Sequence, residues 1–258
     1  MPKPDRKDEI LSALSREGQI DVDALVQRFG VAPQTIRRDL TALVQAGLVS
    51  RTHGSARLVA TSGASSYETR RLRNLRAKAA IAETAAALVP DGASVAINVG
   101  TTTEQVARAL MRHKNLTVVS NNTHIIQILR GASLRSLVVI GGEVRPEDGA
   151  VVGADAVAAL SNYKVDLAII GASALDPDGS ALDFDVREVA VARAILANAR
   201  ETLLVADATK FDVRAPNRIC DLTDLTYVVL DRAPPAAFRA AAETAGTQIF
   251  IADTSETC

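Results

Sequence analysis

Tryptophan is absent from this chain of 258 residues, and aromatic residues of all kinds make up only 3% of it. A hydrophobic core must therefore be built from Leu, Ile, Val and Ala. The hydrophobic share of 48% supplies them in an amount normal for a globular protein. At this length the chain can form one large domain, or a small domain and a medium one.

Cysteine and histidine are scarce as well. The two cysteines, Cys220 and Cys258, cannot form a disulfide framework, and the three histidines show no metal-ligand spacing. No stretch approaches the roughly 18 uncharged apolar residues of a membrane-spanning helix, and the first residues contain no apolar run typical of a signal peptide. We therefore expect a cytoplasmic protein with no metal, no cofactor and no membrane contact.

Neither sign of charge is in excess, since 29 Lys and Arg stand against 30 Asp and Glu. The balance changes along the chain, because residues 1–60 hold nine basic and seven acidic residues and the remainder holds 20 and 23. A slightly basic end on a slightly acidic body permits nucleic-acid binding but does not demonstrate it.

Two short helices are predicted in the first 30 residues. Gly18 is expected to end the first, and Asp21 to cap the second. The residues expected on their buried faces are Ile10, Leu11 and Leu14, followed by Leu25, Val26 and Phe29.

A third helix is predicted from Pro33, a residue that suits the first helical position. Gly47 is expected to stop it. Its apolar face would carry Ile36, Leu40, Leu43 and Val44, and its polar face Gln34, Thr35, Arg37, Arg38 and Thr41. After it, the segment 48–58 is typical of a β-hairpin that turns at Gly54 and carries Arg51 and Arg57.

Three helices followed by a small hairpin predict a winged helix-turn-helix in residues 1–60. A pair of arginines is by itself more often a solvated helix face. Here the pair lies near the start of the third helix, where a recognition helix meets base edges and phosphates. We therefore predict DNA contacts from Gln34, Thr35, Arg37, Arg38, Arg51 and Arg57.

Residues 61–74 are predicted to be a linker, because Thr61–Ser66 is small, polar and without periodicity. From residue 75 to 258, apolar strands alternate with Ala-rich helices, which predicts an α/β domain with a largely parallel sheet. The predicted strands are 94–98, 116–120, 137–140, 165–170, 202–206, 227–230 and 248–251, and the predicted helices include 77–88, 104–112, 186–197 and 236–245.

Ligands of such sheets bind at the carboxyl ends of the strands, so the residues that follow each strand matter most. Five predicted strands end in Gly, small hydroxyl or amide residues, and the fifth is followed by Lys210. A Gly-Thr turn that opens a helix suits a phosphate, although most such turns are plain caps. The predicted effector residues are Asn98, Gly100, Thr101, Thr102, Thr103, Ser120, Asn121, Gly141, Gly142, Asp183, Glu188 and Lys210.

The acidic segment 176–188 leaves three interpretations open: it could bind ligand hydroxyls, bind a metal, or be a solvated loop. Because a carboxylate can also act as a general base, an enzyme has to be considered.

These motifs resemble the DeoR family of transcriptional repressors along nearly the whole chain. The resemblance is carried by the segments 31–40, 47–56, 67–70, 78–82, 100–102 and 207–211. Within the family, segments 100–110, 115–122, 141–149 and 178–185 are most similar to the glycerol-3-phosphate regulon repressors. The resemblance implies a dimer or tetramer that binds operator DNA through paired winged helices and is released by a small phosphorylated effector, sn-glycerol 3-phosphate in that subgroup.

Three positions depart from the family pattern. Ala32 stands where Ser is common, so the third helix lacks a side-chain cap worth about 1 kcal/mol. Ser55 replaces a wing Gly, and Asn98 replaces an Asp before the Gly-Thr-Thr turn.

The sensor domain of this family is in turn similar to ribose-5-phosphate isomerase. By that resemblance, residues 100–103 and Lys210 correspond to phosphate-binding positions of the isomerase, and Glu188 keeps the place of a carboxylate. The isomerase's catalytic Asp pair corresponds to Ile170 and Ser173, which cannot perform that chemistry, and its active-site Lys has no counterpart. The resemblance therefore implies a sensor and not an enzyme.

Two alternatives remain. The chain could be a sugar-phosphate isomerase with an attached DNA-binding module. It could also be an activator, or a sensor of another sugar phosphate such as fructose 1-phosphate or tagatose 6-phosphate.

Overall fold

The computed structural model describes residues 6–45, 49–52, 54–58 and 67–254. The chain divides into two compact units, Met1–Leu75 and Arg76–Cys258, and each has its own hydrophobic core.

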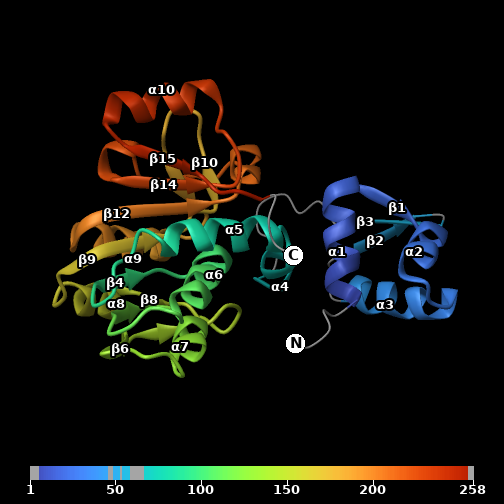
Figure 1. Cartoon of the computed structure of the whole chain (residues 1–258), viewed down its shortest axis with the longest axis horizontal. Helices are drawn as coiled ribbons and strands as arrows, with labels where there is room; N and C mark the ends of the chain where they lie inside the picture. The colour runs from blue at the N-terminus through green and yellow to red at the C-terminus, as the bar shows by residue number, and fades with distance from the viewer. Residues whose placement is uncertain (1–5, 46–48, 53, 59–66, 255–258) are drawn as a thin grey trace. The chain divides into compact units, whose positions relative to one another are not determined.

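The first unit is a winged helix-turn-helix, as predicted (Figure 1). Three helices are followed by a hairpin whose second strand also pairs with a short strand between the first two helices. The elements are α1 (Arg6–Glu17), β1 (Gln19–Asp21), α2 (Val22–Phe29), α3 (Pro33–Gln45), β2 (Val49–Thr52), β3 (Ser55–Leu58) and α4 (Tyr67–Leu72). Strand β1 was not predicted, because three residues are too few to show an alternating pattern.

The apolar residues that recur at helical spacing in the first unit form its core. Ile10, Leu14, Leu25, Ile36 and Leu40 are fully buried. Helix α1 ends before Gly18, whose φ of 74° is a left-handed conformation that glycine adopts readily. The expected stop at Gly47 lies outside the described residues.

Two local expectations for this unit are wrong. Val44 is 40% exposed and does not belong to the core; instead Asp39, on the same helix, is buried. Asp21 does precede α2, but its side chain makes no capping hydrogen bond. Periodicity averages over a whole helix, so it cannot resolve the orientation of a residue at its last turn.

The wing forms as expected, with Thr52 opposite Ser55 and Gly54 at a φ of 89°. Ser55 does not adopt a positive φ. It is buried, and its Oγ accepts a hydrogen bond from Gln19 Nε2 at 2.8 Å. The departure from the family's Gly therefore costs no backbone strain here.

Within the predicted linker, residues 61–66 lie outside the described part of the chain. Residues 67–72, also within the predicted linker, form helix α4. Tyr67 is buried, and Leu72 packs against the core of the first unit, so apolar contacts give this part of the linker a helical structure.

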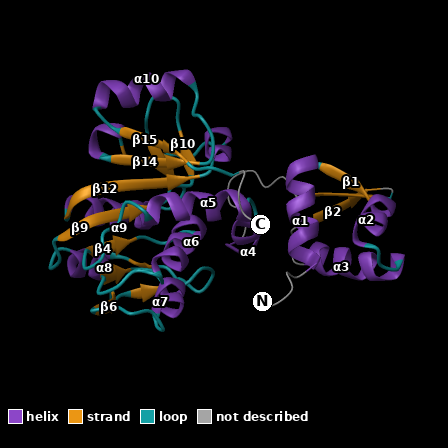
Figure 2. Ribbon diagram, in the orientation of Figure 1, coloured by secondary structure: helices purple, strands orange, loops and turns teal. Residues whose placement is uncertain are grey.

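The second unit is an α/β domain built on one parallel sheet, which confirms the predicted fold class (Figure 2). All seven predicted strands are present, with ends that differ by three residues at most. They are β4 (Ser94–Ile97), β5 (Thr117–Ser120), β6 (Ser136–Val139), β9 (Val165–Ile170), β12 (Ala199–Ala206), β14 (Tyr227–Leu230) and β15 (Gln248–Ile251), in the order β15-β14-β12-β9-β4-β5-β6.

Helices cover both faces of this sheet. Successive strand residues alternate between two apolar clusters, so that Ile169 packs in one and Ile170 in the other. One face is covered by α5 (Leu75–Ala86), α6 (Thr101–Leu110) and α7 (Thr123–Leu129), the other by α8 (Ala154–Leu160), α9 (Val186–Ala197) and α10 (Ala236–Ala245). No helix among the described residues is long and apolar enough to cross a bilayer.

Two small antiparallel sheets accompany the main one and were not predicted. The pair β7 (Glu143–Val144) and β8 (Val151–Val152) forms one. The other contains β10 (Ala174–Leu175), β11 (Ala181–Asp183) and β13 (Asn217–Cys220). Part of the acidic segment 176–188 is therefore strand and helix, not a free loop. Two short 3-10 helices, η1 (Ala208–Asp212) and η2 (Leu222–Asp224), complete the unit.

The strand order places a topological switch point between β4 and β9. From β4 the chain proceeds to β5 and β6 on one side, and from β9 to β12, β14 and β15 on the other. Open α/β sheets bind ligands outside the carboxyl ends of the strands at such a point. The residues after Ile97 and Ile170 are therefore the first place to look for a ligand site.

Candidate DNA and effector sites

Helix α3 presents a polar and basic face to solvent. Gln34, Arg37 and Arg38 are exposed and Thr35 is half-buried, while Ile36 and Leu40 anchor the opposite face in the core. Ala32 accepts a hydrogen bond through its backbone carbonyl from Thr35 N–H, at 2.9 Å, where a Ser side chain would add a further acceptor.

The acidic residue of this helix does not offset its arginines. Asp39 is buried, and its carboxylate accepts a hydrogen bond from Arg6 Nε at 2.6 Å. In the described part of the chain, no ion pair holds Arg37 or Arg38. Their charges are therefore available to a phosphate backbone.

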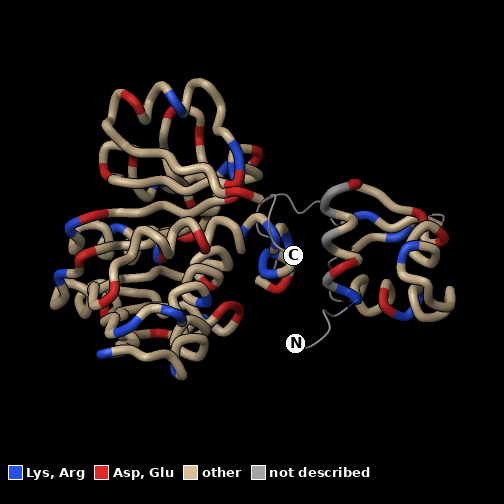
Figure 3. Tube along the Cα trace, viewed as in Figure 1, with Lys and Arg blue, Asp and Glu red and all other residues tan. Residues whose placement is uncertain are grey.

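The wing adds two cations. Arg51 on β2 and Arg57 on β3 are exposed, and Arg57 Nε donates to Ser50 Oγ at 3.0 Å. Elsewhere in both units, Lys and Arg are interspersed with Asp and Glu along the chain (Figure 3). The six predicted DNA contacts thus lie on α3 and the wing of one small domain.

In the second unit, the segment from Asn98 to Thr103 joins β4 to α6 at the switch point. Thr101 and Thr102 are buried at the N-terminus of α6. The first intrahelical bond runs from Glu104 N–H to Gly100 O at 3.0 Å, so the preceding amides belong to the helix end, where anions bind.

Thr103 has a structural use at this turn. Its Oγ1 lies 2.9 Å from Asn98 O and 2.8 Å from Gly100 O, and the residue is fully buried. Its hydroxyl holds the turn in shape, so a ligand at this helix end would meet Thr101 and Thr102 first.

A buried lysine, not predicted as a site residue, lies against the same helix end. Lys78 on α5 is 3% exposed, and its Nζ donates to Thr101 Oγ1 at 3.0 Å. An ammonium group and the positive end of a helix dipole at one place both favour an anion. The sequence did carry a signal, since Lys78 lies three and four residues before Ile81 and Ala82, on the buried side of α5.

Asn98 spans the switch point. Its Oδ1 accepts from Gly171 N–H at 2.9 Å and its Nδ2 donates to Gly171 O at 3.4 Å, which joins the ends of β4 and β9. An Asp at this position could accept the first bond but could not donate the second. The amide therefore acts as a crosslink between neighbouring strand ends.

Ser120 and Asn121, at the end of β5, are fully buried. Like Asn98, they hydrogen-bond to backbone groups of neighbouring segments. Ser120 Oγ donates to Ile97 O at 2.7 Å. Asn121 Oδ1 accepts from Val99 N–H at 3.1 Å, and its Nδ2 donates to Val151 O at 3.0 Å. The structure thus brings Asn98, Thr103, Ser120 and Asn121 together as the support of the turn at Gly100.

Gly141 and Gly142 follow β6 and are exposed. A Cβ on Gly142 would lie 3.0 Å from Val151 Cγ1 and 3.3 Å from Val152 O, so glycine permits the close approach of β8. The role of the two glycines is to begin the β7–β8 hairpin.

Arg145, in the β7–β8 hairpin, ties that hairpin to α9. Its guanidinium donates to both oxygens of Asp148, to Asp185 Oδ2 at 2.7 Å and to Glu188 Oε1. The hairpin also contacts the turn at Gly100, because Val99 packs with Ala150 and Val152. Arg145 thus connects Glu188 to the same edge of the sheet, a link that sequence spacing could not reveal.

Glu188 lies in an acidic environment despite this arginine. Burial, followed by the charge of Asp183, raises the pKa of Glu188 to about 7, against the opposing effect of Arg145. Asp183 is itself buried, and its Oδ1 accepts from Phe184 N–H at 2.7 Å. Among the described residues, no group of three His, Cys, Asp or Glu is arranged to hold a metal ion.

Lys210 lies in η1, directly after β12, and is half-buried. The preceding Asp207 is buried and caps η1, with its Oδ1 accepting from Thr209 N–H at 3.2 Å. In the main sheet, β9 lies between β12 and β4. Lys210 follows β12 and Thr101 follows β4, so the two residues lie on opposite sides of Gly171 at the end of β9.

Comparisons with known proteins agree with this two-part organisation. Residues 6–62 match the model of the DeoR-like helix-turn-helix domain, and residues 73–232 match that of the DeoR C terminal sensor domain. The glycerol-3-phosphate regulon repressor of Haemophilus influenzae is 39% identical over 229 residues, 89% of each chain. The repressor of the same name from Escherichia coli is 35% identical over 237 residues, 92% of this chain and 94% of that one.

Among solved structures, ribose 5-phosphate isomerase from Plasmodium falciparum is similar over 54% of this chain and 52% of its own. The TM-score is 0.37, at 12% sequence identity.

Proposed function

Because this chain belongs to the DeoR family, we propose that it is an operator-binding repressor whose affinity for DNA falls when sn-glycerol 3-phosphate occupies the second unit. A DNA-binding repressor that senses a sugar phosphate is what the family and its relatives support. The identity of the effector, the contact residues and the oligomeric state are our proposals.

The observation that carries the effector proposal is the buried contact between Lys78 and Thr101 at the N-terminus of α6. We assign the phosphate to this helix end, with Gly100, Thr101, Thr102 and Lys78 around it. Lys210 and Glu188 would complete the site from η1 and α9, and Asn98, Ser120, Asn121 and Thr103 would hold the turn in place.

On the DNA side we assign base and phosphate contacts to Gln34, Thr35, Arg37 and Arg38, and phosphate contacts to Arg51 and Arg57. One winged helix buries little surface, so operator binding requires two copies paired about a two-fold axis. By linkage, the effector lowers operator affinity only if it binds the arrangement of the pair that does not fit the operator more tightly than the arrangement that does.

Regulation, and not catalysis, is the proposed role of the second unit. The curated relatives are named repressors. Ile170 and Ser173 stand where the resemblance to the isomerase would require a pair of aspartates, and Glu188 is bound to Arg145. Conversion of a ketose phosphate to an aldose phosphate by the pure protein, lost in Glu188→Gln, would contradict this.

The operator half is tested with the variant Arg37→Ala/Arg38→Ala in a gel-shift titration. We expect at least a tenfold loss of operator affinity, because two unpaired cations leave the recognition helix. Circular dichroism should be unchanged, since both side chains are exposed. Arg232→Ala, an exposed cation of the second unit, serves as the control. Undiminished binding by the double variant would contradict the assignment.

The effector half is tested by thermal shift against glycerol 3-phosphate, fructose 1-phosphate, tagatose 6-phosphate and inorganic phosphate. A bound ligand raises the unfolding temperature by mass action. We expect the largest shift with glycerol 3-phosphate, and its loss in Lys78→Met. A larger shift with another compound would replace the effector, and an undiminished shift in Lys78→Met would move the phosphate site elsewhere.

A further inference from the structure

In the part of the chain that the structure describes, the main sheet has two edge strands, β15 on one side and β6 on the other. Strand β15, with the sequence QIFI, contains neither the charge nor the proline that commonly protects an exposed edge. Ile251 is 48% exposed. Such an edge is a ready template for pairing with another strand.

The backbone groups that point outward from β15 can be identified. Gln248 N–H donates to Thr226 O and Ala252 N–H donates to Leu230 O, both toward β14. Because successive residues of a strand direct their backbone groups to opposite sides, the N–H and C=O groups of Ile249 and Ile251 face away from the sheet. An antiparallel strand placed beside them would form a complete hydrogen-bonded ladder.

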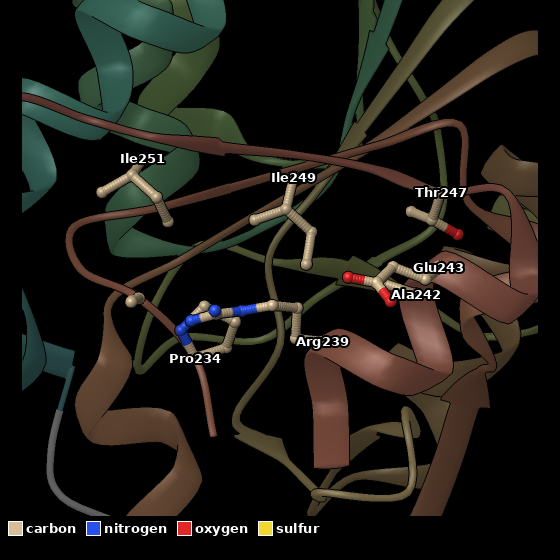
Figure 4. A pocket seen from close by; sticks show the side chains of 8 residues that line it. Pro234, Arg239, Ala242, Glu243, Thr247, Ile249 and Ile251 are labelled. Atoms are coloured by element: carbon tan, nitrogen blue, oxygen red, sulfur yellow. The ribbon is translucent and has the colours of Figure 1, made fainter. Parts of the chain in front are cut away.

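A pocket of about 300 Å³ lies next to this edge, between β15 and α10 (Figure 4). Its lining includes Pro234, Arg239, Glu243, Thr247, Ile249 and Ile251. Ile249 and Ile251 lie on one side of it, and the two charged side chains of α10 lie across from them. An apolar side chain from a neighbouring strand would enter a space that is already apolar on the sheet side.

The charges around the pocket are self-complementary. Arg239 and Glu243 are exposed, lie four residues apart on α10 and have opposite signs. Neither of them takes part in an ion pair among the described residues. Under a two-fold axis, Arg239 of one copy would face Glu243 of the other, which is the pattern an isologous interface requires.

We propose that β15 is the subunit interface: the β15 strands of two copies pair antiparallel and join their sheets into one. The register that uses every outward backbone group sets Ile249 opposite Ile251 of the second copy. A two-fold axis perpendicular to the sheet keeps both α10 helices on one face, where the two pockets merge. The inference rests on the proposed function in one respect, since operator recognition requires paired copies.

The test is Ile251→Pro, with the mass in solution measured by light scattering at micromolar concentration. Proline removes the outward N–H of residue 251 and leaves the bonds to β14 intact. We expect the mass of the assembly to be halved. Val139→Pro is the matched control: on β6, Ile140 N–H points to Ser120 O, so that of Val139 also faces outward, and Val139 is 51% exposed. Its mass should equal that of the unmodified protein.

An unchanged mass for Ile251→Pro, halving of the mass by Val139→Pro, or a monomeric unmodified protein would each overturn the proposal. If Ile251→Pro fails to fold by circular dichroism, the charge variants decide. Arg239→Glu and Glu243→Arg should each weaken the assembly, and the double exchange should restore it; failure of the double variant to restore it would also overturn the proposal. A halved mass with the glycerol 3-phosphate shift retained would separate this interface from the effector site.

Discussion

At the scale of single residues, the polar side chains near the switch point have two different uses. Asn98, Ser120 and Asn121 bond to backbone groups of adjacent strand ends and fix the turn at Gly100. Lys78 and Glu188 bring charge into buried surroundings, which is expensive unless it is paired or used. Residue type alone does not distinguish these two uses. The groups that each side chain contacts in the structure do.

Glu188 provides a pH-dependent prediction. Its pKa is raised from 4.5 to about 7 in the folded protein, so between these values the unfolded chain loses its proton while the folded chain keeps it. The folded state is therefore destabilised as the pH rises from about 4.5 to about 7. In Glu188→Gln this contribution is absent. The unfolding temperature of the variant, relative to that of the unmodified protein, should therefore increase as the pH rises over this range.

The measurement is calorimetry at pH 5, 6, 7 and 8, with the exposed Glu147→Gln as the control. Parallel pH profiles for Glu188→Gln and the unmodified protein would contradict the raised pKa.

At the scale of elements, the β7–β8 hairpin connects the site to the rest of the sheet. Arg145 ties it to α9, and Asn121 ties it to the end of β5. Gly149 completes the attachment, because its carbonyl accepts from Thr123 N–H at 3.1 Å and from Thr123 Oγ1 at 3.0 Å. The hairpin is thus held at three places, and at Gly149 the attachment is a close backbone contact.

Gly149→Ala tests that contact. The residue has a φ of 67°, and a Cβ there would lie 2.2 Å from Thr123 Oγ1. A left-handed non-glycine residue costs about 1 to 3 kcal/mol, and the clash adds to it. Gly246→Ala is the matched control, since its φ of 77° is similar and no atom lies within 4 Å. Urea unfolding should show the larger loss for Gly149→Ala; equal losses would mean that Thr123 moves aside freely.

At the scale of the whole molecule, two units with separate cores carry out the two halves of the function. We propose that the first acts through the charged surface of α3 and the wing, and the second through the buried N-terminus of α6. In a repressor, ligand binding to one unit must alter DNA binding by the other, so the proposed subunit interface matters as much as either proposed site.

Calorimetry of the unmodified protein should therefore resolve two unfolding transitions. Glycerol 3-phosphate should raise the temperature of the transition that belongs to the larger unit and leave the other within about a degree. Assignment follows from Leu25→Ala, a fully buried residue of the first unit, which should lower only the smaller transition, by removing core contacts. A single transition that the ligand raises as a whole would contradict independent units.

The sequence by itself determined the main elements of this protein: the three helices and the wing, all seven strands of the parallel sheet, and the turn at Gly100. It did not reveal β1 or the two small antiparallel sheets. Apolar periodicity and glycine positions are local properties, and they were sufficient for these. Only the tertiary structure decided that Lys78 lies at the end of α6, that Arg145 joins Glu188, and that the β15 edge lies beside a pocket. The first two contacts join residues 23 and 43 positions apart, and the pocket is formed by packing of α10 against β15. Local patterns carry no information about which segments meet when the sheet assembles.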